Sequence, residues 1–149
     1  MIYLDTSAMV KRFVQEPGSR AVDRLLATGK PVGTSVVAYA ELFAALARKR
    51  RDRALPLARY QVVAGEVERE WSTYVRVAVL PTILARSRRL VETHPLRGFD
   101  ALHLASAVYL AEALEVEVTF AAADRRLLDA AAAEGLVAAD VGADRKDAS

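Results

Sequence analysis

The chain has 149 residues, of which 53% are hydrophobic, and a formal net charge of +2. This length fits one domain with a packed core. The absence of cysteine excludes disulfides and thiolate metal sites and is consistent with a reducing cytoplasm. No apolar run approaches the roughly 18 residues that a membrane helix needs. The opening segment MIYLDTSAMV lacks the basic region that begins a signal peptide.

In the first half of the chain, short apolar segments alternate with segments of helical spacing. Pro17 and Gly18 break the first helical segment. Ser7, Ser19 and Ser35 each stand where a side chain can cap the helix that follows. The expected elements, in chain order, are a strand at 2–4, helices at 7–15 and 19–28, a strand at 32–35, and helices at 35–51 and 55–70.

In the second half, Pro81 is well placed for a helix start. The expected elements are a strand at 75–80, helices at 81–93 and 99–114, a strand at 116–121, a helix at 124–134 and a strand at 136–141. The helix at 99–114 is apolar almost all round, which predicts burial on several sides. We expect residues 1–141 to form a single domain and the polar residues 142–149 to form a frayed tail.

The expected strands are apolar throughout rather than alternating, and helices separate them. This pattern favours an α/β sandwich in which a parallel sheet is covered on both faces. In such sheets ligands bind beyond the carboxyl ends of the strands. Asp5 and Asp124 each follow a predicted strand, so both are expected at that edge.

Four carboxylates stand nearly alone in apolar surroundings. Asp5 is the only charge in the first ten residues, Glu41 and Asp100 are the single carboxylates of long apolar stretches, and Asp124 closes an uncharged run. A buried carboxylate is costly unless it is paired or binds a metal. Four of them indicate one acidic pocket for a hard divalent cation, Mg²⁺ or Mn²⁺.

Each acid also has a simpler interpretation. Asp5 can cap a helix, although a cap does not require the Thr6 and Ser7 that follow; these two hydroxyls could orient neighbouring groups or hold a metal-bound water. Glu41 can be an exposed position on an amphipathic helix. It stands one residue from the stripe Val37, Ala40 and Ala44, which we expect to pack inward.

Asp100 near a helix start complements the macrodipole, but it also heads a core-facing stripe. His103, one turn on, is expected to be a hydrogen-bonded structural histidine rather than a metal ligand. Asp124 can cap its helix. The adjacent Arg125 and Arg126 could contact a phosphate group or form a solvated helix face.

Basic residues gather in three places, which suits a polyanion approaching a metal but equally describes solvated helix faces. The clusters are Arg48, Lys49, Arg50, Arg51 and Arg53; Arg86, Arg88 and Arg89; and Arg125 with Arg126. Small and apolar residues at 43–47 and 55–67 could form a groove for an amphipathic partner segment or could be ordinary core.

Four segments in order resemble the motifs of PIN-domain nucleases. They are IYLDTSA at 2–8, SVVAYAEL at 35–42, FDALHLA at 99–105 and TFAAADRRL at 119–127. The resemblance covers nearly the whole chain. With Lys11, Glu16, Gly18 and Ser19, it is most like the VapC-type toxins of bacterial type II toxin–antitoxin systems.

The resemblance implies a three-layer α/β/α sandwich with a mainly parallel sheet and an endoribonuclease dependent on Mg²⁺ or Mn²⁺. It maps the catalytic carboxylates onto Asp5, Glu41, Asp100 and Asp124, and the metal ligands onto the three aspartates. It also implies a homodimer, a cognate antitoxin, and cleavage to a 5′-phosphate and a 3′-hydroxyl. One departure is Ala122, where the family often has a hydroxyl residue; Thr6 or Ser7 would then have to replace its function.

Two other functions fit the same residues. One is a catalytically weak or inactive PIN-like module that binds RNA or protein, which the loss of an acid would favour; none is lost. The other is a metal-dependent phosphatase or DNA nuclease with the same pocket. Measuring the cleavage of RNA, DNA and small phosphoesters in parallel would distinguish these functions from an endoribonuclease.

Overall fold

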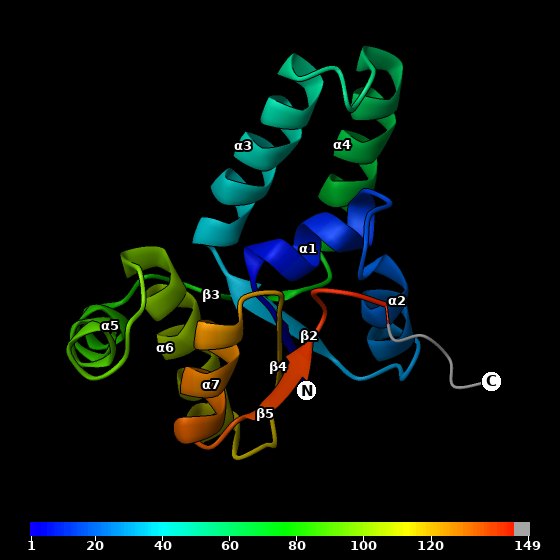
Figure 1. The fold of residues 1–149 in the computed structure, drawn as a ribbon. Helices are drawn as coiled ribbons and strands as arrows, with labels where there is room; N and C mark the ends of the chain where they lie inside the picture. Colours follow the sequence, from blue (N-terminus) through cyan, green and yellow to red (C-terminus); the bar gives the residue numbers. More distant parts are fainter. Residues whose placement is uncertain (145–149) are drawn as a thin grey trace.

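Five short strands lie side by side in the computed structural model, which describes residues 1–144 (Figure 1). They are β1 (Ile2–Leu4), β2 (Val32–Ser35), β3 (Val75–Val77), β4 (Thr119–Ala122) and β5 (Val137–Asp140). Their order is β3-β2-β1-β4-β5, and every neighbouring pair is parallel. The predicted parallel sheet is therefore confirmed. β3 ends three residues earlier than predicted, and β4 begins three residues later.

Seven helices connect and cover these strands within the described residues. They are α1 (Thr6–Phe13), α2 (Ser19–Leu26), α3 (Val37–Arg51), α4 (Leu57–Trp71), α5 (Pro81–Thr93), α6 (Gly98–Leu114) and α7 (Arg125–Ala133). Successive residues of a strand point to opposite faces. In β1, Ile2 and Leu4 accordingly belong to one hydrophobic core and Tyr3 to the other.

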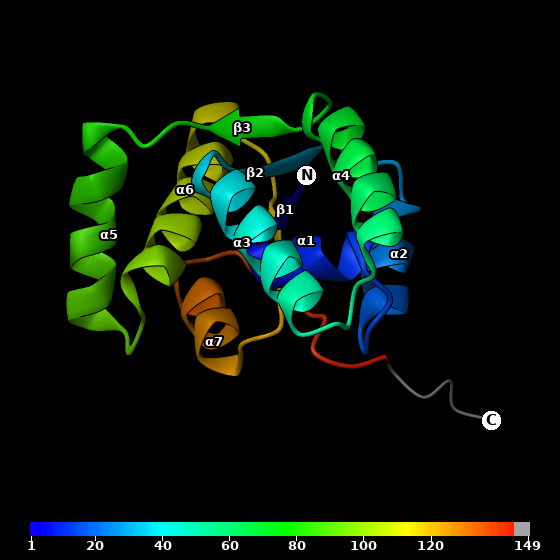
Figure 2. The same cartoon turned by 90° about the horizontal axis from the view of Figure 1, so that it is seen from above.

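The two cores divide the helices between the two faces of the sheet. Buried residues of α1 to α4 pack on one face, and buried residues of α5, α6 and α7 pack on the other (Figures 1 and 2). The α/β/α sandwich is thus confirmed. Helix α6 has buried residues around most of its circumference, as predicted, because it lies between the sheet and α5.

Helices α3 and α4 form an arm that rises away from the sheet (Figure 1). The predicted inward stripe of α3 is wrong, since Ala40 and Ala44 are exposed and the buried residues are Ala38, Leu42 and Leu46. In α4, Val63 and Val67 are buried as predicted, but Leu57 and Val62 are exposed. The reason is that these helices pack mainly on α1 and on each other, not on the sheet.

The helix caps differ in part from those predicted. Of the two caps considered for α1, Asp5 rather than Ser7 is the N-cap; Gly18, not Ser19, precedes α2; and Val36, not Ser35, precedes α3. Each observed cap lies within two residues of the predicted serine. For α1 the cause is visible in the chain path, because the helix begins directly after β1 and leaves no intervening residue for the cap but Asp5.

The last described residues run from β5 past the start of α2. The backbone N–H of Val141 donates to the carbonyl of Ala122, and that of Ala21 donates to the Asp144 carboxylate at 3.2 Å. The remainder of the predicted tail, residues 145–149, lies outside the described residues, and the domain limits 1–141 stay a prediction. Within residues 1–144, none of the helices combines the length and apolar character needed to cross a bilayer.

Candidate active site

The order in which the chain adds strands to the sheet reverses between β1 and β4. From β1 the chain moves outward to β2 and β3, and it then returns to β4 on the other side of β1. Such a switch point leaves a crevice at the carboxyl ends of the two central strands. Asp5 directly follows β1, and Asp124 stands two residues after β4. Strand order alone therefore brings together two carboxylates that are far apart in the sequence.

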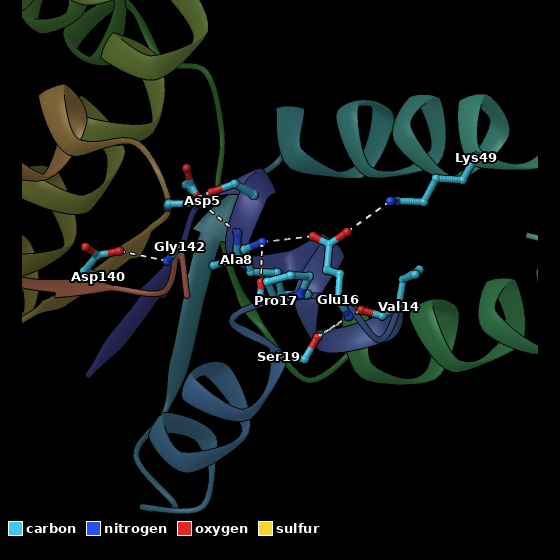
Figure 3. A network of polar contacts seen from close by, with 12 residues as sticks. Asp5, Ala8, Val14, Glu16, Pro17, Ser19, Lys49, Asp140 and Gly142 are labelled. Atoms are coloured by element: carbon cyan, nitrogen blue, oxygen red, sulfur yellow. Dashed lines mark hydrogen bonds and ion pairs between the residues drawn. The ribbon is translucent and has the colours of Figure 1, made fainter. Parts of the chain in front are cut away.

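Asp5 is 6% exposed and is held by neutral donors. Its Oδ1 accepts hydrogen bonds from Ser7 Oγ at 2.7 Å and from the Ala8 backbone N–H at 2.8 Å (Figure 3). Burial raises the pKa of Asp5 above its ordinary value of 3.8; these two donors and the nearby His103 ring lower it, and the charge of Asp100 raises it. The net result is a carboxylate whose charge is incompletely compensated by the protein.

Ser7 also joins β1 to the loop that follows β4. Its Oγ accepts from the backbone N–H of Ala123 at 3.0 Å while donating to Asp5. Ala122 is fully buried at the end of β4 and belongs to the core beneath α6 and α7. Ser7 thus supplies a hydroxyl at this junction; that Thr6 or Ser7 compensates for Ala122 stays a prediction.

Glu41 reaches the same edge from α3. Its Oε1 accepts from Thr6 Oγ1 at 2.8 Å and lies 2.8 Å from His103 Nε2. Burial alone would raise the pKa of Glu41, but the hydrogen bonds from His103 and Thr6 outweigh it and hold the pKa below the ordinary value of 4.5. Glu41 is therefore ionised at neutral pH.

Asp100 and Asp124 complete the acidic edge. Asp100 lies in the first turn of α6, and burial raises its pKa; the charge of Asp124 adds to this shift, and Arg97, through its backbone N–H and its side-chain charge, and His103 oppose it. Asp124 caps α7, with its Oδ1 accepting from the backbone N–H groups of Arg126 and Leu127. The helix-capping interpretations of Asp5 and Asp124 are thus correct and compatible with a common site.

The donor set fits a hard divalent cation. Carboxylate oxygens are the ligands that Mg²⁺ and Mn²⁺ prefer, and Mg²⁺ commonly binds through one or two carboxylates while keeping several waters. Among residues 1–144, no lysine or arginine forms an ion pair with Asp5, Asp100 or Asp124. In the same part of the chain, no three acidic or histidine side chains are spaced to coordinate one ion by themselves. An ion here would accordingly keep waters or bind substrate oxygens.

The basic clusters are not equivalent. In the second cluster, Arg86 forms two hydrogen bonds with Glu112, and Arg88 pairs with Glu92. In the third, Arg125 pairs with Asp129 at 3.1 Å on the exposed side of α7. The structure therefore does not bring Arg125 to the acids, and Arg126 is exposed on the first turn of the same helix.

Tyr3 is a residue of the site that the sequence interpretation missed. It is fully buried, and its hydroxyl lies 2.9 Å from His103 Nδ1. A signal was present, because a tyrosine inside an apolar strand needs a hydrogen-bond partner for its hydroxyl. His103 was expected to be a hydrogen-bonded histidine, and the structure agrees, since both its ring nitrogens have partners.

Comparison with known proteins places this geometry in context. A sequence model of the PIN domain family matches residues 2–133. Ribonuclease VapC49 of Mycobacterium tuberculosis is 33% identical over 135 residues, covering 91% of this chain and 92% of that protein.

Two solved structures share the fold. The crystal structure of FitAcB from Neisseria gonorrhoeae superposes with a TM-score of 0.64 at 18% identity, covering 95% of this chain and 99% of the other. A toxin–antitoxin complex from Klebsiella pneumoniae gives a TM-score of 0.55 at 18% identity, covering 80% and 84%.

Proposed function

This chain belongs to the PIN domain family, and we propose that it is a divalent-metal-dependent endoribonuclease acting as the toxin of a toxin–antitoxin pair. One observation carries the proposal: carboxylates after β1, in α6 and at the start of α7 lie at the switch point without an ion pair to lysine or arginine among the described residues. A buried carboxylate such as Asp5, with two partly buried carboxylates nearby, favours a cation over an empty site. The ribonuclease name of the Mycobacterium relative supports RNA as the substrate.

Asp5, Asp100 and Asp124 would hold Mg²⁺ or Mn²⁺ together with water molecules, because the three side chains are not spaced to coordinate one ion by themselves. When bound, such an ion supplies Lewis-acid activation of water and neutralises phosphate charge. The protein groups have separate tasks. Ser7 and the Ala8 N–H fix the Asp5 carboxylate, and Thr6 fixes Glu41.

Glu41 is the group available to orient a water. Only its Oε1 has hydrogen-bond partners among the described residues, and no buried side-chain oxygen there is left unsatisfied. Its Oε2 therefore reaches solvent as an ionised acceptor, which can align a water for attack on phosphorus. Hydrolysis in this way needs no side-chain nucleophile.

The proposal includes two partners and a location. A cognate antitoxin is supported by the toxin–antitoxin complex that shares the fold. Leu57 and Val62, two exposed apolar side chains of α4, are available for contact with it. The proposal also includes a homodimer, which the family resemblance supports. It includes a cytoplasmic location as well, with which the absence of cysteine is consistent.

The test is cleavage of total RNA by the purified chain with Mg²⁺, with Mn²⁺ and with a chelator. The site variant is Asp100→Asn, and the matched control is Asp129→Asn, which changes an exposed aspartate paired with Arg125. Discrete products that require metal, persist in the control and vanish in the site variant are expected. If a folded chain cleaves no RNA at any metal concentration, the chain is a binding module instead; cleavage of DNA or small phosphoesters alone would point to the other phosphoester hydrolases.

A further inference from the structure

A line of four polar side chains connects the centre of the sheet to the α3–α4 arm. It runs from Tyr3 in β1 to His103 in α6, and on to Glu41 in α3 and Thr6 in α1. Tyr3 and His103 are buried, and Glu41 is partly exposed at the acidic edge. His103 is the only member that contacts the other three among the described residues.

Hydrogen-bond donors and acceptors fix the tautomer of His103. Thr6 Oγ1 has one proton, and it donates that proton to Glu41 Oε1. At 3.1 Å from His103 Nε2, the same oxygen must then accept, so Nε2 carries a proton. That N–H is shared between Thr6 and the carboxylate, 2.8 Å away.

The other ring nitrogen is an acceptor. The Tyr3 hydroxyl is fully buried and lies 2.9 Å from His103 Nδ1, with Ser106 and the Ser35 backbone as further neighbours. When Nε2 carries the only ring proton, Nδ1 is an acceptor for this buried O–H. A chain of donors then runs from the sheet towards Glu41.

Ring packing holds the hydrogen-bonded side chains of Tyr3 and His103 in place. The Tyr3 ring stacks on Phe120 of β4, with ring centroids 5.3 Å apart and an interplanar angle of 7°. The edge of one ring faces the other in the Tyr3–His103 pair, with centroids 5.9 Å apart. Glu41, by contrast, has three rotatable side-chain bonds and sits on a helix of the arm that leaves the sheet (Figures 1 and 2).

We propose that His103 is a positioning residue that fastens the Glu41 carboxylate to the sheet, with Tyr3 setting the imidazole tautomer. The inference rests on the proposed nuclease function. It assigns His103 no contact with substrate or metal. Loss of a supporting hydrogen bond of this kind typically lowers activity about 10- to 100-fold.

Two amide substitutions separate positioning from packing. In His103→Gln the side-chain N–H₂ can occupy the place of Nε2 and reach Glu41. In His103→Asn the amide is shorter and reaches only the place of Nδ1. His94→Gln is the matched control, because His94 also bonds a carboxylate, Glu134, but at the opposite end of α7 from Asp124. Thermal unfolding of each variant reports whether it folds.

The expected result is a kcat about 10- to 100-fold lower in His103→Asn with KM little changed, and a kcat within about fivefold of the parent in His103→Gln. His94→Gln is expected to match the parent. Equal kcat values in the Asn and Gln variants, or a parent-like kcat in both, would overturn the positioning role. If the parent itself cuts no RNA, the proposed function fails and this inference fails with it.

Nuclear magnetic resonance supplies a readout independent of activity. Long-range ¹H–¹⁵N correlation on ¹⁵N-histidine-labelled protein distinguishes the two neutral tautomers. We expect His103 protonated on Nε2 in the parent, and a displaced Nδ1 resonance in Tyr3→Phe, because the donor to Nδ1 is removed. Protonation of His103 on Nδ1 in the parent would contradict the proposal, even if every variant lost activity.

Discussion

Two carboxylates at opposite ends of α1 are held in opposite ways (Figure 3). Asp5, before the helix, accepts only from a hydroxyl and a backbone N–H. Glu16, after it, accepts from Lys11 and Lys49, both at 3.0 Å. Burial raises the pKa of Asp5, whereas for Glu16 the bonds from the two lysines outweigh burial and lower the pKa.

The difference distinguishes a structural acid from a functional one. Glu16 already has its cations, and it ties the turn after α1 to the last part of α3. Asp5 has none among the described residues, so a cation from solution can still stabilise it. A buried carboxylate without a basic partner is therefore the more informative feature, although both residues are conspicuous acids near the same helix.

The largest expected effect is that of Asp5→Asn on RNA cleavage. We expect a loss of about 100- to 1000-fold, the range for removal of one electrostatic group from an active site. The melting temperature should be unchanged or higher, because a buried negative charge is removed. Single-turnover cleavage and thermal unfolding measure the two quantities. Cleavage at the parent rate would show that Asp5 is only a helix cap.

Gly18→Ala should destabilise the turn after α1, where Glu16 lies, through a steric clash. Gly18 has φ +94°, and a Cβ there would lie 1.9 Å from the Val141 carbonyl oxygen. We expect a loss of about 3 kcal/mol in the free energy of unfolding, measured by urea denaturation. Gly29→Ala is the control, since Gly29 has φ +70° with nothing within 4 Å, and strain alone should cost about 1 kcal/mol. Equal losses in the two variants would exclude the clash as the cause.

Glu16→Gln should reduce stability and leave the kcat of the folded protein within about twofold of the parent. Removing a charged acceptor costs about 1–2 kcal/mol here, because the three side chains are partly exposed and screened. Since the pKa of Glu16 is lowered by folding, its contribution is fully present above the unfolded value near 4.5 and is lost as pH falls through the folded value. The deficit of the variant should therefore be constant near pH 7 and shrink below about pH 4.5. A deficit that grew with acidification would contradict this assignment.

The smallest expected effect is stabilisation by Mg²⁺ alone. At five times its dissociation constant, the ion should add about 1 kcal/mol to the free energy of unfolding of the parent. The same gain is expected in Glu16→Gln and none in Asp5→Asn, because only the second variant changes a proposed ligand. Unfolding measured across a Mg²⁺ titration tests this without any RNA. An equal gain in Asp5→Asn would place the ion elsewhere.

The sequence predicted the strands and helices closely because local patterns carry that information. Pro81 starts α5, and the turn at Pro17 and Gly18 separates α1 from α2, as expected. The inward face of α3 was predicted wrongly for a physical reason. Helical spacing gives several candidate stripes, and the choice depends on which neighbours the helix packs against; here they are α1 and α4.

By itself, the sequence determined the parallel α/β architecture and the four candidate acids, because apolar runs and isolated charges are local properties of the chain. Only the tertiary structure decided which polar groups touch. The link from Tyr3 through His103 to Glu41 joins β1, α6 and α3, and no spacing rule connects residues 3, 41 and 103. The same holds for Lys49, which reaches Glu16 from α3. Side-chain partners across a fold depend on strand order and helix packing, and these are set by the core as a whole.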